Sequence, residues 1–238
     1  MYCGKFEVGN VGINFEGDGY ITPQKYFEYS DRETSLQLKL FNGHVNQSIS
    51  GDRKLTVMHQ ESNMHLFKRL MCYMLDLYSS EYSAIHGSGI SLDNKGILFT
   101  GPSGHGKSTL AKAFSNSQIL DDDLLILTEN KMGVSGKFGT RTIKKEEYSY
   151  LKPIKGKNAI KSHQLDFAFL LDKRFKGGYC NEVENVIPRM YSHLTISPML
   201  TRKQRLLKNS EVNARVFVLG TNGNLEKTKE SIEEIISS

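Results

Sequence analysis

The residues with the clearest chemistry form a glycine-rich segment, residues 101–108 (Gly-Pro-Ser-Gly-His-Gly-Lys-Ser). The segment matches the pattern Gly-x-x-x-x-Gly-Lys-Ser/Thr, in which backbone N–H groups turn inward onto phosphate oxygens. In such a loop the lysine, here Lys107, bridges the β- and γ-phosphates, and the hydroxyl of Ser108 contacts Mg²⁺. The segment therefore predicts a site for ATP with magnesium. The residues expected to contact the nucleotide are Gly101, Ser103, Gly104, His105, Gly106, Lys107, Ser108 and Thr109.

The residues on either side of this segment provide the setting that a phosphate-binding loop needs. An apolar run at residues 96–100 leads into the loop and predicts a buried strand, while residues 108–114 have the composition of a helix. A helix that begins at such a loop adds the partial positive charge of its N-terminus to the phosphate site. This order of strand, loop and helix makes an accidental match to the pattern less probable.

Three consecutive carboxylates, Asp121, Asp122 and Asp123, follow the loop lysine by about fifteen residues. Adjacent like charges repel one another unless a cation lies close, which favours a metal ion or the loop lysine nearby. Carboxylates beside such a loop can hold Mg²⁺, and one of them can accept the proton of an attacking hydroxyl. We therefore predict a metal site from Ser108, Asp122 and Asp123; the alternative is a solvated acidic turn. The strand expected at 124–127 follows the acids, whereas an ordinary Walker B acid follows its strand.

A histidine upstream of the loop is a further candidate. His86 is followed by Gly-Ser-Gly, and residues 83–91 read as a strand that a turn at residues 93–96 separates from the loop strand. An imidazole at this place could contact a phosphate or orient the acidic cluster. The alternative is an ordinary histidine of a strand.

These motifs in this order resemble the catalytic domain of HPr kinase/phosphorylase and its smaller relatives, which carry a His-Gly pair, a phosphate-binding loop and then an Asp-Asp pair. The resemblance covers about residues 82–130 well and the C-terminal strand and helix more loosely. It implies an α/β fold related to phosphoenolpyruvate carboxykinase, with a mixed sheet flanked by helices. It also implies phosphorylation of a seryl hydroxyl on a protein or peptide, in which Asp122 accepts the proton, Asp123 is its partner and His86 lies near them.

The sequence departs from the bifunctional enzyme of that family. It has no counterpart of the Glu-x-Arg-Gly-Leu-Gly segment associated with phosphorolysis, and the region before residue 80 is short and unlike the regulatory domain. The sequence therefore does not point to phosphorolysis or to HPr as the acceptor. The compact relatives include kinases that phosphorylate the C-terminal serine of lasso-peptide precursors, and a basic second half of the chain suits a peptide acceptor.

An arginine or lysine is expected to neutralise charge on the transferring phosphoryl group. Arg141 is the first candidate because Gly139, two residues earlier, would let the backbone approach a ligand. Arg189 and Arg202 are the alternatives.

The rest of the pattern divides the chain into a β-rich N-terminal subdomain, residues 1–60, and a catalytic domain, residues 61–238. The first part alternates short apolar stretches with turns and predicts hairpins or a small antiparallel sheet. Helices are expected at 62–78, in part of 192–207 and at 225–236, and strands at 167–171 and 214–219. Residues 137–162 are rich in lysine and predict a loop or excursion outside the core, and the polar segment 173–185, with Gly177-Gly178, is expected to be mobile.

Charge and composition limit the partners. Residues 131–208 hold 17 Lys or Arg against 6 Asp or Glu, in a chain whose net charge is +5. This basic half fits an anionic partner such as nucleotide phosphates or an acidic substrate, or else a solvated basic face. The chain has no apolar run of membrane-spanning length and no signal-peptide pattern, so we expect a cytoplasmic protein with no membrane partner. The three cysteines have no Cys-x-x-Cys spacing and are expected to be free thiols.

The leading hypothesis is a Mg-ATP-dependent kinase that transfers the γ-phosphoryl group to a Ser or Thr hydroxyl of a peptide or protein. A kinase for a small hydroxyl compound and an ATP-binding switch with weak hydrolysis are the alternatives. Nucleic acid is not the expected partner, because only Phe138, Tyr148 and Tyr150 offer aromatic side chains beside the basic residues. The acceptor's identity and a homo-oligomeric state stay open.

Overall fold

The structure is a computed structural model of the 238-residue chain. It describes residues 2–8, 11–17, 24, 27–29, 36–42, 46–50, 54–59, 70, 83–128, 130–134, 136–144, 149–154, 159–184, 186–188 and 209–238. The expected helices at 62–78 and 192–207 and the alternative arginines, Arg189 and Arg202, lie outside the described residues, apart from Leu70, which is helical and buried.

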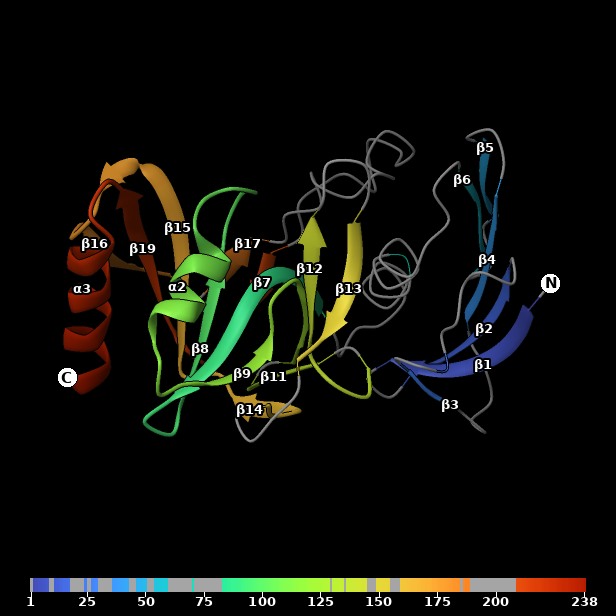
Figure 1. The fold of residues 1–238 in the computed structure, drawn as a ribbon, viewed down its shortest axis with the longest axis horizontal. Helices are drawn as coiled ribbons and strands as arrows, with labels where there is room; N and C mark the ends of the chain where they lie inside the picture. Colours follow the sequence, from blue (N-terminus) through green and yellow to red (C-terminus); the bar gives the residue numbers. More distant parts are fainter. Residues whose placement is uncertain are drawn as a thin grey trace.

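A nine-stranded mixed sheet is the largest unit (Figure 1). Eight strands lie in the order β14-β11-β10-β7-β8-β15-β19-β16, and β9 pairs with β7. The neighbours β8, β15 and β19 are parallel, and every other pair in this sheet is antiparallel. The strands are β7 (Ser83–Leu92), β8 (Lys95–Thr100), β9 (Gln118–Asp121), β10 (Leu124–Leu127), β11 (Lys131–Val134), β14 (Ser162–Gln164), β15 (Phe167–Lys176), β16 (Cys180–Val183) and β19 (Arg215–Asn222).

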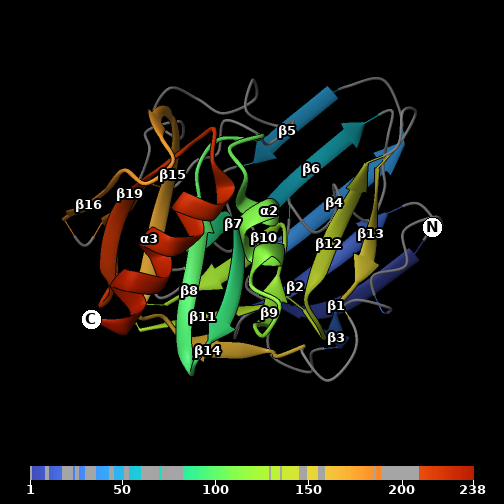
Figure 2. The same ribbon diagram turned by 60° about the vertical axis from the view of Figure 1, so that its left-hand side comes forward.

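One face of this sheet is covered by the helices α2 (Lys107–Ala113) and α3 (Leu225–Ser237), which lie in front of it in Figure 2. The parallel register pairs Phe99 with Phe169 and Phe169 with Phe217, and these rings stack at centroid distances of 5.8 and 5.5 Å. Phe114, at the end of α2, stacks on Phe99 at 6.3 Å. The helices and the aromatic row form one buried cluster, to which α3 contributes Ile232. The expected mixed sheet with flanking helices is therefore confirmed.

The opposite face of the sheet carries the alternate residues of the same strands. Leu98, Ala168 and Val216 belong to a second buried cluster, together with Ile85 and Leu125. Successive side chains of a strand point to opposite faces, so a strand buried on both faces reads as a continuous apolar run. This is why the runs at 97–99 and 167–171 predicted buried strands.

The C-terminal helix has a clear start. The side chain of Asn224 accepts hydrogen bonds from the backbone N–H groups of Glu226 and Lys227, at 2.9 and 3.2 Å. Such a cap satisfies backbone donors that have no partner inside the helix. The helix expected at 225–236 is confirmed, and no helix of the described residues is long and apolar enough to cross a membrane.

A six-stranded sheet at the N-terminal end of the chain lies away from α3 in Figure 1 and has the order β3-β1-β2-β4-β6-β5. The expectation of an antiparallel sheet was wrong in part, because β2 and β4, and β4 and β6, are parallel. A long connection, residues 18–35, joins β2 to β4, and parallel neighbours need such a crossover. The division after residue 60 stays a prediction. The strands are β1 (Tyr2–Val8), β2 (Val11–Gly17), β3 (Glu28–Tyr29), β4 (Leu36–Asn42), β5 (Asn46–Ser50) and β6 (Lys54–His59).

The expected loop at 137–162 was wrong in part because it contains strands, and the polar segment 173–185 contains strands as well. In the lysine-rich segment, β12 (Thr140–Lys144) pairs with β13 (Ser149–Pro153), and Leu151 is buried. In the polar segment, β15 continues to Lys176 and the chain turns at Gly178 (φ +94°), after which β16 returns along β19. The second piece is polar because β16 is an edge strand and β15 has no β8 partner beyond Leu170, so residues 172–176 and 180–183 are exposed or half-buried. A short pair, β17 (Val186–Pro188) and β18 (Asn209–Glu211), completes the described elements.

The packing of α3 can be tested by truncation. Ile232→Ala removes a fully buried side chain between α3 and the sheet and is expected to lower the free energy of unfolding by about 2–5 kcal/mol. Leu225→Ala, on the same helix but 38% exposed, is the matched control and should change it by less than about 1 kcal/mol. Urea unfolding measures both variants, and equal losses would contradict the packing described.

Candidate functional site

The glycine-rich segment connects β8 to α2, as its sequence setting predicts. β8 ends at Thr100, the loop spans 101–106, and α2 begins at Lys107. Gly101, Gly104 and Gly106 have φ angles of +143°, +78° and +94°. A Cβ at Gly104 or Gly106 would meet nothing within 4 Å, so the backbone conformation alone requires glycine there. The loop therefore has the curled backbone in which successive N–H groups can face an anion.

The lysine of the loop lies folded over the loop's own start. Its Nζ donates to the carbonyl oxygens of Gly101 and Pro102, both at 2.9 Å, and the residue is 8% exposed. Among the other predicted nucleotide contacts, Ser108 is half-buried, whereas Ser103 and Thr109 are exposed. An anion bound at the loop could accept a strong charge-assisted hydrogen bond from this ammonium.

His105 ties the loop to a different strand. Its Nδ1 lies 3.0 Å from the carbonyl oxygen of Leu171 in β15. A carbonyl only accepts, so Nδ1 carries the proton and Nε2 is the remaining nitrogen. A Cβ at Gly101 would lie 2.8 Å from the same oxygen, so the first glycine also allows β15 to approach. The position of the loop is thus set by β15 as well as by β8.

The three aspartates are held differently, and Asp121 is a structural residue. It is fully buried, and its Oδ1 accepts from the backbone N–H groups of Asp123 and Leu124 at 3.0 and 3.3 Å. Its Oδ2 accepts from the backbone N–H of Thr140 at 3.1 Å. Three backbone donors thus stabilise the Asp121 carboxylate, which has a structural reason to be buried here.

Asp122 is the better placed of these two to act on a hydroxyl. Its Oδ1 accepts a hydrogen bond of 2.7 Å from the hydroxyl of Ser88 in β7, and its Oδ2 lies 3.7 Å from Nζ of Lys112 in α2. Its backbone N–H donates to the carbonyl of Thr140 at 2.9 Å. The carboxylate is therefore oriented by a serine and lies beside the helix that follows the loop.

Asp123 faces the predicted histidine. Its Oδ1 lies 3.8 Å from Nε2 of His86, with side chains 5% and 19% exposed. His86 and Ser88 are two residues apart on β7 and so lie on the same face of that strand. The backbone carbonyl of His86 also accepts from the hydroxyl of Thr100 at the end of β8, at 3.0 Å. The fold thus brings His86, Asp122 and Asp123 together beside the glycine-rich loop.

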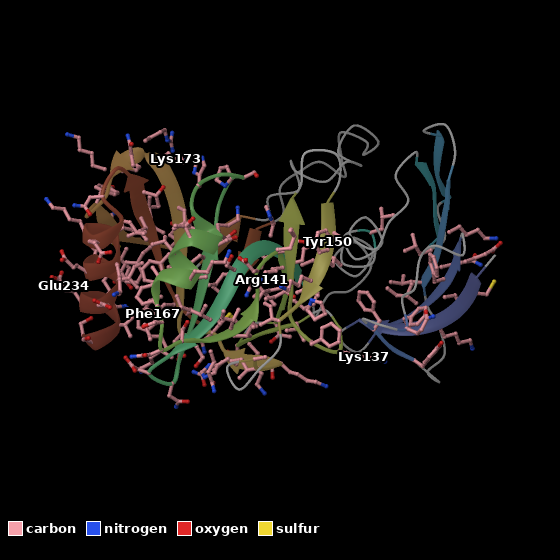
Figure 3. All side chains as sticks on the ribbon, viewed as in Figure 1. Lys137, Arg141, Tyr150, Phe167, Lys173 and Glu234 are labelled. Atoms are coloured by element: carbon pink, nitrogen blue, oxygen red, sulfur yellow. The ribbon has the colours of Figure 1, made fainter. Side chains whose placement is uncertain are left out.

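Arg141 lies on β12 (Figure 3). Asp122 and Arg141 form an isolated parallel bridge, and the arginine side chain is half-buried. The reason given above for Gly139 was wrong, because a Cβ there would overlap the carbonyl oxygen of Leu120 in β9. Glycine is required by the close packing of β9 on the entry to β12, and that packing is what puts Arg141 beside Asp122.

The residues predicted to hold a metal ion are oxygen donors. No group of three His, Cys, Asp or Glu side chains in the described part of the chain could hold a metal on its own. Mg²⁺ binds in nucleotide sites through one or two carboxylates together with phosphate oxygens and water. Asp122, Asp123 and the hydroxyl of Ser108 therefore fit a magnesium ion that arrives with a nucleotide, and do not fit a metal site formed by protein alone.

Two residues of this site were missed by sequence reasoning. Ser88 could have been found from the two-residue period of β7, which puts it on the face of His86. Lys112 is four residues after Ser108 in α2, and this spacing puts both on one face of a helix. Neither signal distinguishes a site residue from a surface residue until the acidic cluster is placed.

The different roles of the aspartates can be tested by stability. Asp121→Ala leaves three backbone donors without their carboxylate and is expected to lower the free energy of unfolding by at least about 2 kcal/mol. Asp122→Asn keeps the shape and is expected to lower it by less than about 1 kcal/mol. Urea unfolding of the two variants and the unchanged chain measures the difference. A larger loss for Asp122→Asn than for Asp121→Ala would contradict the assignment.

No family model matches the chain, and a sequence comparison with curated proteins finds no match. Among solved structures, the chain has similarity to the Hpr(Ser) kinase/phosphatase from Coxiella burnetii, with a TM-score of 0.37 and 17% sequence identity. The aligned part covers 65% of this chain and 92% of that one.

Proposed function

We propose that the chain is a Mg-ATP-dependent kinase that transfers the γ-phosphoryl group of ATP to a Ser or Thr hydroxyl of a peptide or protein. The observation that carries the proposal is the Asp122 carboxylate, oriented by Ser88 at 2.7 Å and lying 3.7 Å from Lys112 of the helix that follows the glycine-rich loop. A protein that only binds a nucleotide needs the loop. A protein that transfers a phosphoryl group to a hydroxyl also needs an oriented carboxylate beside the loop.

On this proposal the loop holds the donor. Backbone N–H groups of residues 101–106 and the ammonium of Lys107 bind the phosphates, for which Lys107 exchanges its two carbonyl partners. Ser108, Asp122 and Asp123 would hold Mg²⁺, which when bound neutralises charge on the phosphate oxygens.

The acceptor hydroxyl lies against Asp122. Asp122 takes its proton as the oxygen attacks the γ-phosphorus, a new O–P bond forms, and the bond from phosphorus to the β–γ bridging oxygen breaks to release ADP. Arg141 stabilises the charge on the transferring group, while His86 faces Asp123 and holds the second carboxylate in place. The hydrogen bond from Ser88 orients Asp122 for this step.

The acceptor class and the family rest on the sequence motifs. The His-Gly pair, the loop and the acidic pair support a fold of the HPr kinase C-terminal type, and the basic composition of residues 131–208 supports a peptide acceptor that carries or gathers negative charge. We also propose that the protein is cytoplasmic.

The transfer itself is tested with γ-labelled ATP, magnesium and a library of peptides that bear Ser or Thr. We expect label on a peptide hydroxyl, and we expect Asp122→Asn to lower the rate by about 10²–10⁴-fold with little change in ATP binding. Asp166→Asn is the matched control and should keep the rate, because this carboxylate lies just before β15 and accepts from the N–H of Gly96 and the amide of Gln164, away from the loop. Label that appears only in small hydroxyl compounds would overturn the peptide acceptor, and full activity of Asp122→Asn would overturn the proposed base.

The donor site is tested separately by binding. Lys107→Ala is expected to weaken Mg-ATP binding by about tenfold or more, because a charge-assisted bond to phosphate is lost. Isothermal titration calorimetry measures the change, with Lys131→Ala on an exposed strand residue as the control. Unchanged affinity in Lys107→Ala would refute the role given to this loop.

A further inference from the structure

A hollow of about 550 Å³ opens on the side of the glycine-rich loop that faces β15. Pro102 and His105 of the loop form one wall, and Leu171 and Asp172 of β15 and Val218 of β19 are among the residues opposite. Its lining is mainly apolar, and its volume lies in the range of small-molecule sites. Apart from the loop residues, none of the residues that line it has a role in the proposed function.

The hollow and the acidic cluster lie on opposite sides of β8. At the end of that strand, Thr100 pairs with Gly87 of β7 on one edge and with Leu170 of β15 on the other. His86, Ser88 and the aspartates are on the β7 side, whereas the hollow is on the β15 side. In Figure 3, Lys173 on β15 lies well apart from Arg141.

The geometry of phosphoryl transfer links the β7 side and the β15 side of the loop. The attacking oxygen and the leaving oxygen lie roughly in line, on opposite sides of the phosphorus. If Asp122 receives the proton of the acceptor on the β7 side, the departing diphosphate extends toward the β15 side, and the nucleoside extends beyond it. We propose that the hollow binds the base and ribose of the donor nucleotide. The inference rests on the proposed function, because it takes Asp122 as the acceptor side.

The chemistry of the hollow suits such a ligand. Leu170 of β15 and Val218 of β19 pair across the sheet and offer an apolar surface to a flat base, which would otherwise expose its faces to water. At the rim, Arg174 donates to Asp172 from its backbone N–H at 2.9 Å and from Nε and a terminal nitrogen of its guanidinium at 2.9 and 2.6 Å. The side-chain hydrogen bonds from Arg174 are the main cause that lowers the pKa of Asp172, so this carboxylate is ionised at neutral pH. An ionised carboxylate accepts hydrogen bonds from the hydroxyls of a ribose.

A hydrogen bond joins the glycine-rich loop to β15 beside the hollow. The hydrogen bond between Nδ1 of His105 and the carbonyl of Leu171, at 3.0 Å, joins one wall to the other. This hydrogen bond holds the phosphate-binding loop against β15. A nucleotide bound by its phosphates would meet a preformed surface for its base, which lowers the entropic cost of binding.

The test compares Mg-ATP with magnesium and inorganic tripolyphosphate, which carries the phosphates without the nucleoside. We expect ATP to bind at least about tenfold more tightly by calorimetry. Val218→Phe fills the hollow and should bring ATP affinity down to that of tripolyphosphate, with tripolyphosphate binding changed by less than about twofold.

A rim variant keeps the test independent of core packing. Asp172→Asn is expected to weaken the binding of ATP by a few-fold and to leave the binding of tripolyphosphate unchanged. Glu182→Gln removes a carboxylate from a similar exposed pair, Glu182–Arg215, that does not line the hollow. It should leave the binding of both ATP and tripolyphosphate unchanged. Equal affinity of the unchanged chain for ATP and tripolyphosphate would overturn the nucleoside site and leave the proposed kinase standing. Failure of both to bind would overturn the donor site and this inference with it.

Discussion

The buried carboxylate of Asp121 is the constraint on which the candidate site depends. Its two oxygens accept three backbone N–H groups, from Asp123, Leu124 and Thr140. The first two bonds close the turn between β9 and β10, and the third joins that turn to β12. Burial of a charge is costly unless donors surround it, and here the donors belong to the backbone that must be positioned. The direction of Asp122 and Asp123, and the place of Arg141 beside them, both follow from this one set of hydrogen bonds.

The parallel pairing of β8 with β15 is the second determinant. It stacks Phe99 on Phe169 in the core and places the carbonyl of Leu171 against the loop at the end of the strand. The antiparallel pairing of β8 with β7 places His86 and Ser88 near the loop on the other edge of β8. A loop between two such neighbours has one side lined by carboxylates and one side lined by apolar groups. For the proposed kinase this asymmetry separates the acceptor side from the nucleoside side, because the attacking and leaving oxygens lie on opposite sides of the phosphorus.

Some elements of the fold could be predicted from the sequence and others could not. The buried strands and α3 were predictable, because apolar runs and the helical period carry the signal directly. The pair β12–β13 was taken for a loop, and the polar end of β15 and β16 were not predicted as strands, since exposed strands keep polar residues on their solvent side and resemble connections. The parallel pairs of the N-terminal sheet were missed for another reason: strand direction depends on how the intervening chain crosses over, and residues 18–35 carry no periodic signal for it.

The sequence by itself determined the chemical groups of the site: a glycine pattern that lets the loop curl, a lysine and serine after it, and acids and a histidine at fixed distances along the chain. These are local properties, set by backbone freedom and side-chain type. Only the tertiary structure decided how three like residues divide their roles, with Asp121 held by backbone donors and Asp122 by the hydroxyl of Ser88. The physical reason is that burial and hydrogen-bond partners come from strands distant in sequence, and no spacing along the chain records which strands become neighbours.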